Sequence, residues 1–210
     1  MNGIKRFAAG ALIVAVGIAS VGCTKFKTRD DYIEALTAID AQWIGDSETI
    51  SRDEKNFDAL DGEFVVADDD RAQEFYDDLM KGYNGLRDSE VDMALYYVET
   101  SLYGDMHLNT YVISVTFKNK DDADLMYKEW KDFISGFDDT KSGSIGKKYF
   151  IAYQEDFNVV SGEDIDLESG VYQSGKQVSI IYSLHESSRE DKAAGKVCKA
   201  LGLVDPAKAK

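Results

Sequence analysis

Three carboxylates stand at alternate positions in an acidic segment of the C-terminal part, a spacing that suits a calcium ion. Asp164, Asp166 and Glu168 are spaced like the first ligands of a calcium-binding loop. An EF-hand would also need a glycine at position 169 and a glutamate at position 175, where this chain has Ser169 and Gly175. Two interpretations stay open: an irregular calcium site of low affinity, and a solvated acidic loop, which is the default.

Two other runs match catalytic signatures only in part. The run from Gly170 to Lys176 comes close to a phosphate-binding loop, but Gln177 replaces the hydroxyl residue that holds magnesium, so a hairpin turn is the better interpretation. Ser144 and Lys147 have the S-x-x-K spacing of serine acyl-enzymes. That chemistry places the serine at a helix N-terminus, whereas this pair is predicted to lie in a glycine-rich loop. We therefore predict no catalytic residue and no enzymatic activity.

The two histidines of the chain do not form a recognisable metal or catalytic motif. His107 is predicted to lie in a hairpin turn and His185 at the end of a strand, and neither has the spacing of a zinc ligand pair. No nucleophile stands beside either residue in the sequence. Apart from weak calcium binding, we expect no metal ion and no organic cofactor.

The N-terminus has the pattern of a secretory signal. A short cationic start, MNGIKR, is followed by an uncharged run over 7–22, which ends in Ser20, Val21 and Gly22 before Cys23. At 16 residues this run is shorter than the roughly 20 that a membrane-spanning helix needs. It fits the apolar region of a cleaved signal peptide instead.

The ending Ser20-Val21-Gly22-Cys23 resembles the lipobox of bacterial lipoprotein precursors, although leucine is more common at the first position. The resemblance implies cleavage between Gly22 and Cys23, with diacylglycerol on the Cys23 thiol and often an acyl chain on the new N-terminus. Two or more acyl chains hold a protein firmly on a membrane. Export and anchoring to the outer face of the bacterial cell membrane are therefore expected, or to the outer membrane if the organism has one. The alternatives are an ordinary signal peptide followed by a stray cysteine, and an uncleaved anchor.

The other cysteine, Cys198, has no disulfide partner once Cys23 is lipidated. It falls in a helical pattern with Ala194, Val197 and Leu201. We predict that it is a small buried hydrophobic residue and not a nucleophile.

Composition excludes some partners and favours one packed domain. The chain carries 24 basic and 39 acidic residues, and loss of Lys5 and Arg6 with the signal leaves a net charge of −17. Such a chain repels nucleic-acid phosphates, so we expect no nucleic-acid partner. The single proline, Pro206, and the absence of a Ser-rich linker favour one domain over 30–204, after a signal peptide at 1–22 and a lipidated tether at 23–29.

Hydrophobic periodicity predicts an α+β fold. Thr28 and Asp31 form a capping-box pair that begins a first helix. Over 62–154 the order is β-α-β-β-α-β, with strands at 63–68, 91–100, 110–118 and 148–154, helices at 70–83 and 121–137, and a loop at 143–146. After a loop at 161–170, an extension over about 169–202 adds strands at 171–174 and 177–184 and a helix at 188–202.

The order over 62–154 resembles the ferredoxin-like split βαβ arrangement, which implies an antiparallel sheet with both helices on one face. The N-terminal helix and the C-terminal hairpin plus helix would extend this core. The whole is similar in style to small uncharacterised bacterial lipoproteins built from such units, and this likeness implies no activity.

Export, tethering and the lack of a catalytic motif together favour a non-catalytic module that binds an envelope protein, a peptide or a small molecule. An exposed sheet face or edge would be its site, with Tyr96, Tyr97, Tyr111 and Tyr153 as candidate anchors. The alternative for these tyrosines is cross-strand packing in the core. The alternatives for the protein are an envelope hydrolase without a recognisable motif, and a structural or assembly factor of a membrane complex.

Overall fold

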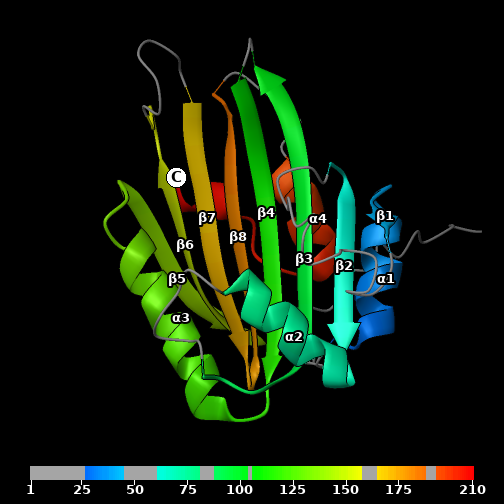
Figure 1. Ribbon diagram of the computed structural model, residues 1–210. Coiled ribbons are helices and arrows are strands. Elements are labelled where there is room, and N and C mark those ends of the chain that lie inside the picture. Colours follow the sequence, from blue (N-terminus) through cyan, green and yellow to red (C-terminus); the bar gives the residue numbers. More distant parts are fainter. Residues whose placement is uncertain (1–26, 45–60, 81–87, 104–105, 158–164, 188–192) are drawn as a thin grey trace, which may run out of the picture.

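The computed structural model describes residues 27–44, 61–80, 88–103, 106–157, 165–187 and 193–210 (Figure 1). The signal, the predicted lipid attachment residue Cys23, the cleavage residue Gly22 and the predicted calcium ligand Asp164 lie outside these ranges. One mixed sheet of eight strands forms the middle of the molecule, in the order β1-β2-β3-β4-β8-β7-β6-β5. The class predicted from the sequence, α+β, is therefore confirmed.

The elements follow one another along the chain with short connections. They are α1 (Arg29–Thr37), β1 (Gln42–Trp43), β2 (Glu63–Asp68), α2 (Asp69–Leu79), β3 (Val91–Tyr103), β4 (Met106–Phe117), α3 (Lys120–Ile134), β5 (Asp139–Ile145), β6 (Lys147–Gln154), β7 (Ile165–Ser174), β8 (Gln177–Glu186), α4 (Ala193–Leu201) and a 3₁₀ helix, η4 (Pro206–Ala209). Neighbouring strands are antiparallel, except that β1 pairs with β2 in parallel.

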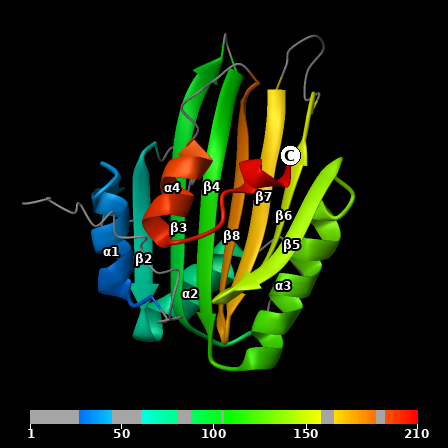
Figure 2. The same cartoon turned by 180° about the vertical axis from the view of Figure 1, so that it is seen from behind.

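Helices cover both faces of the sheet. Helices α2 and α3 lie on the face seen in Figure 1, whereas α1, α4 and η4 lie on the opposite face (Figure 2). Since side chains alternate along a strand, each strand contributes to two separate cores. In β4, Val115 and Phe117 pack on the α2/α3 side, while Val112 packs with Leu36 of α1 and Val197 of α4 on the other. We call these sides the α2/α3 face and the α1/α4 face.

The first helix begins as the sequence predicts. The Thr28 hydroxyl accepts from the Asp31 backbone N–H at 3.2 Å, and the Asp31 carboxylate accepts from the Thr28 N–H at 2.7 Å. Cys198 of α4 is buried at 1% exposure, which confirms its placement in the core. No helix in the part of the chain that the structure describes is long and apolar enough to cross a membrane.

The ferredoxin-like arrangement predicted over 62–154 is not confirmed. In that fold the strands before and after a helix run parallel, but β2 and β3, which flank α2, pair directly and antiparallel, with Glu63 opposite Val98. The neighbour of β4 on its other side is β8, from the C-terminal extension. The reason is that β8 matches β4 along seven residues, so the extension enters the middle of the sheet and enlarges it.

Two segments predicted as loops are strands. The loop prediction at 143–146 is wrong over Gly143–Ile145, which belong to the edge strand β5. The loop prediction at 161–170 is wrong from Ile165 onward, because β7 starts there and is buried between β6 and β8. Both segments are rich in polar residues and glycine, and their strand state depends on neighbours that are distant in sequence.

Candidate functional site

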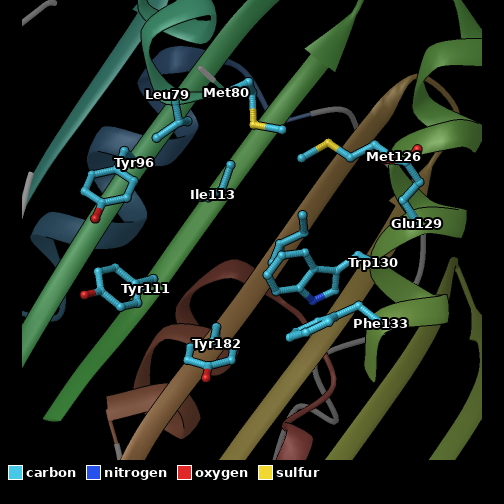
Figure 3. A pocket seen from close by; sticks show the side chains of 11 residues that line it. Leu79, Met80, Tyr96, Tyr111, Ile113, Met126, Glu129, Trp130, Phe133 and Tyr182 are labelled. Carbon is cyan, nitrogen blue, oxygen red and sulfur yellow. The ribbon is translucent and has the colours of Figure 1, made fainter. Parts of the chain in front are cut away.

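An apolar groove of about 590 Å³ lies on the α2/α3 face, between the two helices and above β3, β4 and β8 (Figure 3). Its volume falls in the range of pockets that hold small molecules. Its lining residues are mostly aromatic or aliphatic and come from five elements or their ends: Leu79, Met80, Tyr96, Tyr111, Ile113, Met126, Glu129, Trp130, Phe133, Ile180 and Tyr182.

Cross-strand register builds the floor of the groove. Ile113 of β4 stands opposite Tyr96 of β3 on one side and Ile180 of β8 on the other, so the three form one row. In the next row, Tyr111 stands opposite Tyr182. The period-2 alternation of these strands turns both rows toward the α2/α3 face.

Helix α3 supplies an aromatic wall. The Trp130 ring centroid lies 5.3 Å from that of Phe133 and 6.4 Å from that of Tyr182, the second contact being edge-to-face. The Trp130 indole Nε1 donates to the Ser169 hydroxyl at 3.2 Å, and this hydroxyl donates to the Ile181 carbonyl at 2.8 Å. These bonds hold the indole against the sheet. Phe133 is 57% exposed, an unusual state for a large apolar side chain.

The groove has few polar groups. Glu129 is its one charged lining residue among the described residues, and it lies on α3 next to Trp130. Beside the floor, the Asn109 amide Nδ2 donates to the Tyr111 hydroxyl at 2.6 Å. The other side-chain atom of this amide, Oδ1, is buried without a hydrogen-bond partner in the described part of the chain.

Titratable side chains gather on the opposite, α1/α4 face. Asp166 is 2% exposed, and its carboxylate accepts from the hydroxyls of Tyr153 and Ser187, the latter at 2.7 Å, and from the Asp156 N–H at 3.4 Å. Burial alone would raise the pKa of Asp166, but these hydrogen bonds and the charge of nearby His185 outweigh it and lower that pKa.

A second buried pair adjoins this carboxylate. His185 Nε2 lies 2.9 Å from Glu168 Oε1, and the two side chains are 4% and 0% exposed. On the other side of the ring, Nδ1 lies 3.1 Å from the carbonyl oxygen of Glu186. A polar depression of about 650 Å³, partly lined by Tyr153, Asp166 and Lys210, lies at the border of this network.

This network is poorly suited to acid–base chemistry. A carboxylate with a lowered pKa is a weak base near neutral pH, and the Asp166 oxygens already accept three hydrogen bonds. The Cys198 thiol is buried, and burial raises its pKa, which opposes nucleophilic use. The network therefore stabilises the fold, and the groove is the stronger candidate site.

The structure separates the predicted calcium ligands. Asp166 and Glu168 belong to the interior of β7 and contact Ser187 and His185 respectively, and Asp164 lies outside the described residues. No cluster of three or more acidic, histidine or cysteine side chains that suits a metal ion occurs in the residues the structure describes. His107 lies in β4 opposite Leu102, next to the hairpin turn in which it was predicted.

The four candidate tyrosines divide between the two faces. Tyr96 and Tyr111 line the groove, as an exposed sheet face predicted. Tyr97 is buried on the α1/α4 face, where its hydroxyl donates to Glu99 at 2.7 Å, and Tyr153 belongs to the Asp166 network. Trp130, Phe133, Glu129 and Tyr182 were missed; the apolar stripe of α3, which is wider than a sheet contact needs, was the signal that could have found the two aromatic residues of α3.

Comparisons with protein-family models, with curated proteins and with solved structures found no match to this chain, so the groove is interpreted from its own geometry.

Proposed function

We propose that this chain is an exported bacterial lipoprotein that binds an apolar ligand in the groove between α2 and α3. The observation that carries the binding role is the groove itself: an aromatic and aliphatic lining with an exposed Phe133. Apolar surface left open in this way marks ligand-binding sites more often than it marks catalytic ones.

The rival hypothesis of an envelope hydrolase would need converging polar groups beside the reacting bond. The groove instead presents Glu129 alone among ring and alkyl groups. The acid–histidine pair of Glu168 and His185 points toward the α1/α4 face, away from the groove. A binding role therefore accounts for the lining better than hydrolysis does.

The tether is proposed from the sequence alone. Cys23 is five residues before the Thr28 cap of α1, so a lipid on Cys23 would hold the domain close to the membrane. The acidic domain would be repelled by an anionic lipid surface and would face outward. Export by the signal and acylation of Cys23 place the groove outside the cytoplasm in this proposal.

The tether is tested by labelling cells with a fatty acid. The native chain should incorporate label and sediment with membranes, whereas a Cys23→Ser variant should do neither. Equal labelling of the two chains would contradict the lipid on Cys23 and leave the groove proposal intact.

The binding role is tested with a neutral apolar dye, N-phenyl-1-naphthylamine, excited by energy transfer from tryptophan. The chain has two tryptophans, and only Trp130 lines the groove. Transfer should persist in Trp43→Phe and be lost in Trp130→Phe. Transfer that is lost in Trp43→Phe and kept in Trp130→Phe, or no dye binding at all, would contradict the proposal.

A further inference from the structure

The charges around the groove bear on what kind of ligand it takes. Its one charged lining residue in the described chain is Glu129, which makes no hydrogen bond or ion pair with other described residues. The basic residues nearest to it on α3 are engaged elsewhere: Lys128 Nζ lies 2.6 Å from Asp132, and Lys131 Nζ lies 5.4 Å from the centre of the Phe150 ring. A negatively charged ligand would therefore meet no compensating cation in the lining.

The field at the lower end of the groove has the same sign. Tyr76 of α2 packs in the same core as Met126. Burial raises the pKa of Tyr76 to about 12, and the carboxylates of Asp122, Asp77 and Glu129 add to the rise, while a hydrogen bond with Ser89 opposes it. Carboxylates from both helices thus act on one point between them.

The aromatic lining favours a cation as well. Trp130, Phe133 and Tyr182 form one group of rings, and Tyr96 and Tyr111, with centroids 6.1 Å apart, form another. The faces of such rings attract an organic cation, by about 0.5–1 kcal/mol at exposed sites and more where water is excluded. The buried Asn109 Oδ1 beside the floor is a further acceptor without a donor among the described residues.

We propose that the occupant of the groove is an organic cation with an apolar, preferably aromatic, body, its charge held by the aromatic rings and Glu129. This proposal rests on the binding function proposed above and adds the chemical class of the ligand. A neutral apolar molecule would use the rings but not Glu129, and an anion would be repelled.

The test uses two ions of the same shape and opposite charge, tetraphenylphosphonium and tetraphenylborate. Binding is followed by Trp130 fluorescence in the Trp43→Phe variant, in which Trp130 is the remaining tryptophan. We expect the phosphonium ion to bind at least about ten-fold more tightly, from ring attraction and carboxylate charge together. Glu129→Gln should weaken its binding by up to about five-fold, the range of a partly exposed charge pair, and leave the neutral dye unaffected.

A matched control removes the same charge from the opposite face. Glu34 is an exposed residue of α1, so Glu34→Gln changes the net charge equally without touching the groove. It should leave the affinity for the phosphonium ion unchanged. An equal loss in both variants would show a general charge effect and overturn the role of Glu129.

The outcomes separate this inference from the binding function. Equal affinity for the two ions, or binding of the neutral dye without either ion, would overturn the cation class and leave the groove as a binding site. If the dye and both ions fail to bind, the binding function itself fails.

Discussion

The two faces of the sheet are built by the same strands and end in opposite states. On the α1/α4 face, α1 and α4 contact each other, and titratable groups such as Asp166 and Glu168 are enclosed with partners. On the α2/α3 face, a groove separates the two helices, and Phe133 stays exposed. Polar residues therefore serve stability on the closed face, and apolar residues are left available for binding on the open one.

The difference follows from how each face satisfies its side chains. Across β4 and β8 the closed face carries hydroxyl pairs, with Ser114 and Ser179 oxygens 2.6 Å apart and those of Thr110 and Ser183 also 2.6 Å apart. Such pairs are complete without a ligand. The aromatic rows of the open face have no equivalent cover over their full length, so a ligand would complete their burial.

The largest effect is expected from opening the closed face. Asp166→Ala removes the acceptor of three hydrogen bonds in a 2% exposed site, and we expect the free energy of unfolding to fall by about 3 kcal/mol. Urea unfolding measures this loss. As a control, Asp132→Ala breaks only the exposed pair with Lys128 and should cost less than about 0.5 kcal/mol. Similar losses in the two variants would show that the Asp166 network is not the stabilising feature described.

A smaller effect is expected from acid. Because the pKa of Asp166 is lowered in the folded state, its ionised form stabilises the fold above its unfolded value of about 3.9, and this contribution is lost as the pH falls below that value toward the folded pKa. The difference in free energy of unfolding between the native chain and Asp166→Asn should therefore shrink from pH 6 toward pH 3. A difference that stays constant over this range would contradict the lowered pKa.

The smallest effect on stability is expected on the open face. Phe133 is 57% exposed, so Phe133→Ala should change the free energy of unfolding by no more than about 0.5 kcal/mol. It should nonetheless weaken binding of the neutral dye several-fold, because it removes one ring from the aromatic wall. The matched control is Leu125→Ala, an exposed α3 position outside the groove, and dye affinity that falls equally in both variants would separate binding from this wall.

Local patterns in the sequence predicted much of the fold. The Thr28–Asp31 cap, the amphipathic helices α2 and α3 and the alternation in β4 were all found, because each depends on residues close together in the chain. Strand order was not, since the pairing of β8 with β4 joins residues far apart in sequence.

The same reason explains the errors in the site. Asp166 and Glu168 suggested a solvated loop because their partners, Ser187 and His185, are distant in sequence and become visible only in the register of β7 and β8. Tyr96 and Tyr97 were predicted as equals, although alternation requires adjacent residues to face opposite sides of a strand. Which of the two faces the groove depended on the placement of α2 and α3.

The most direct test of the account compares methionines on the two faces by photolabelling with benzophenone, a neutral apolar probe that inserts into C–H bonds near methionine sulfur. Met80 and Met126 line the groove, whereas Met93 packs on the α1/α4 face. The account predicts saturable labelling at Met80, Met126 or the adjoining rings of α3, and none at Met93. Labelling at Met93 in preference to the groove residues would contradict the claim that the α2/α3 face is the one that binds.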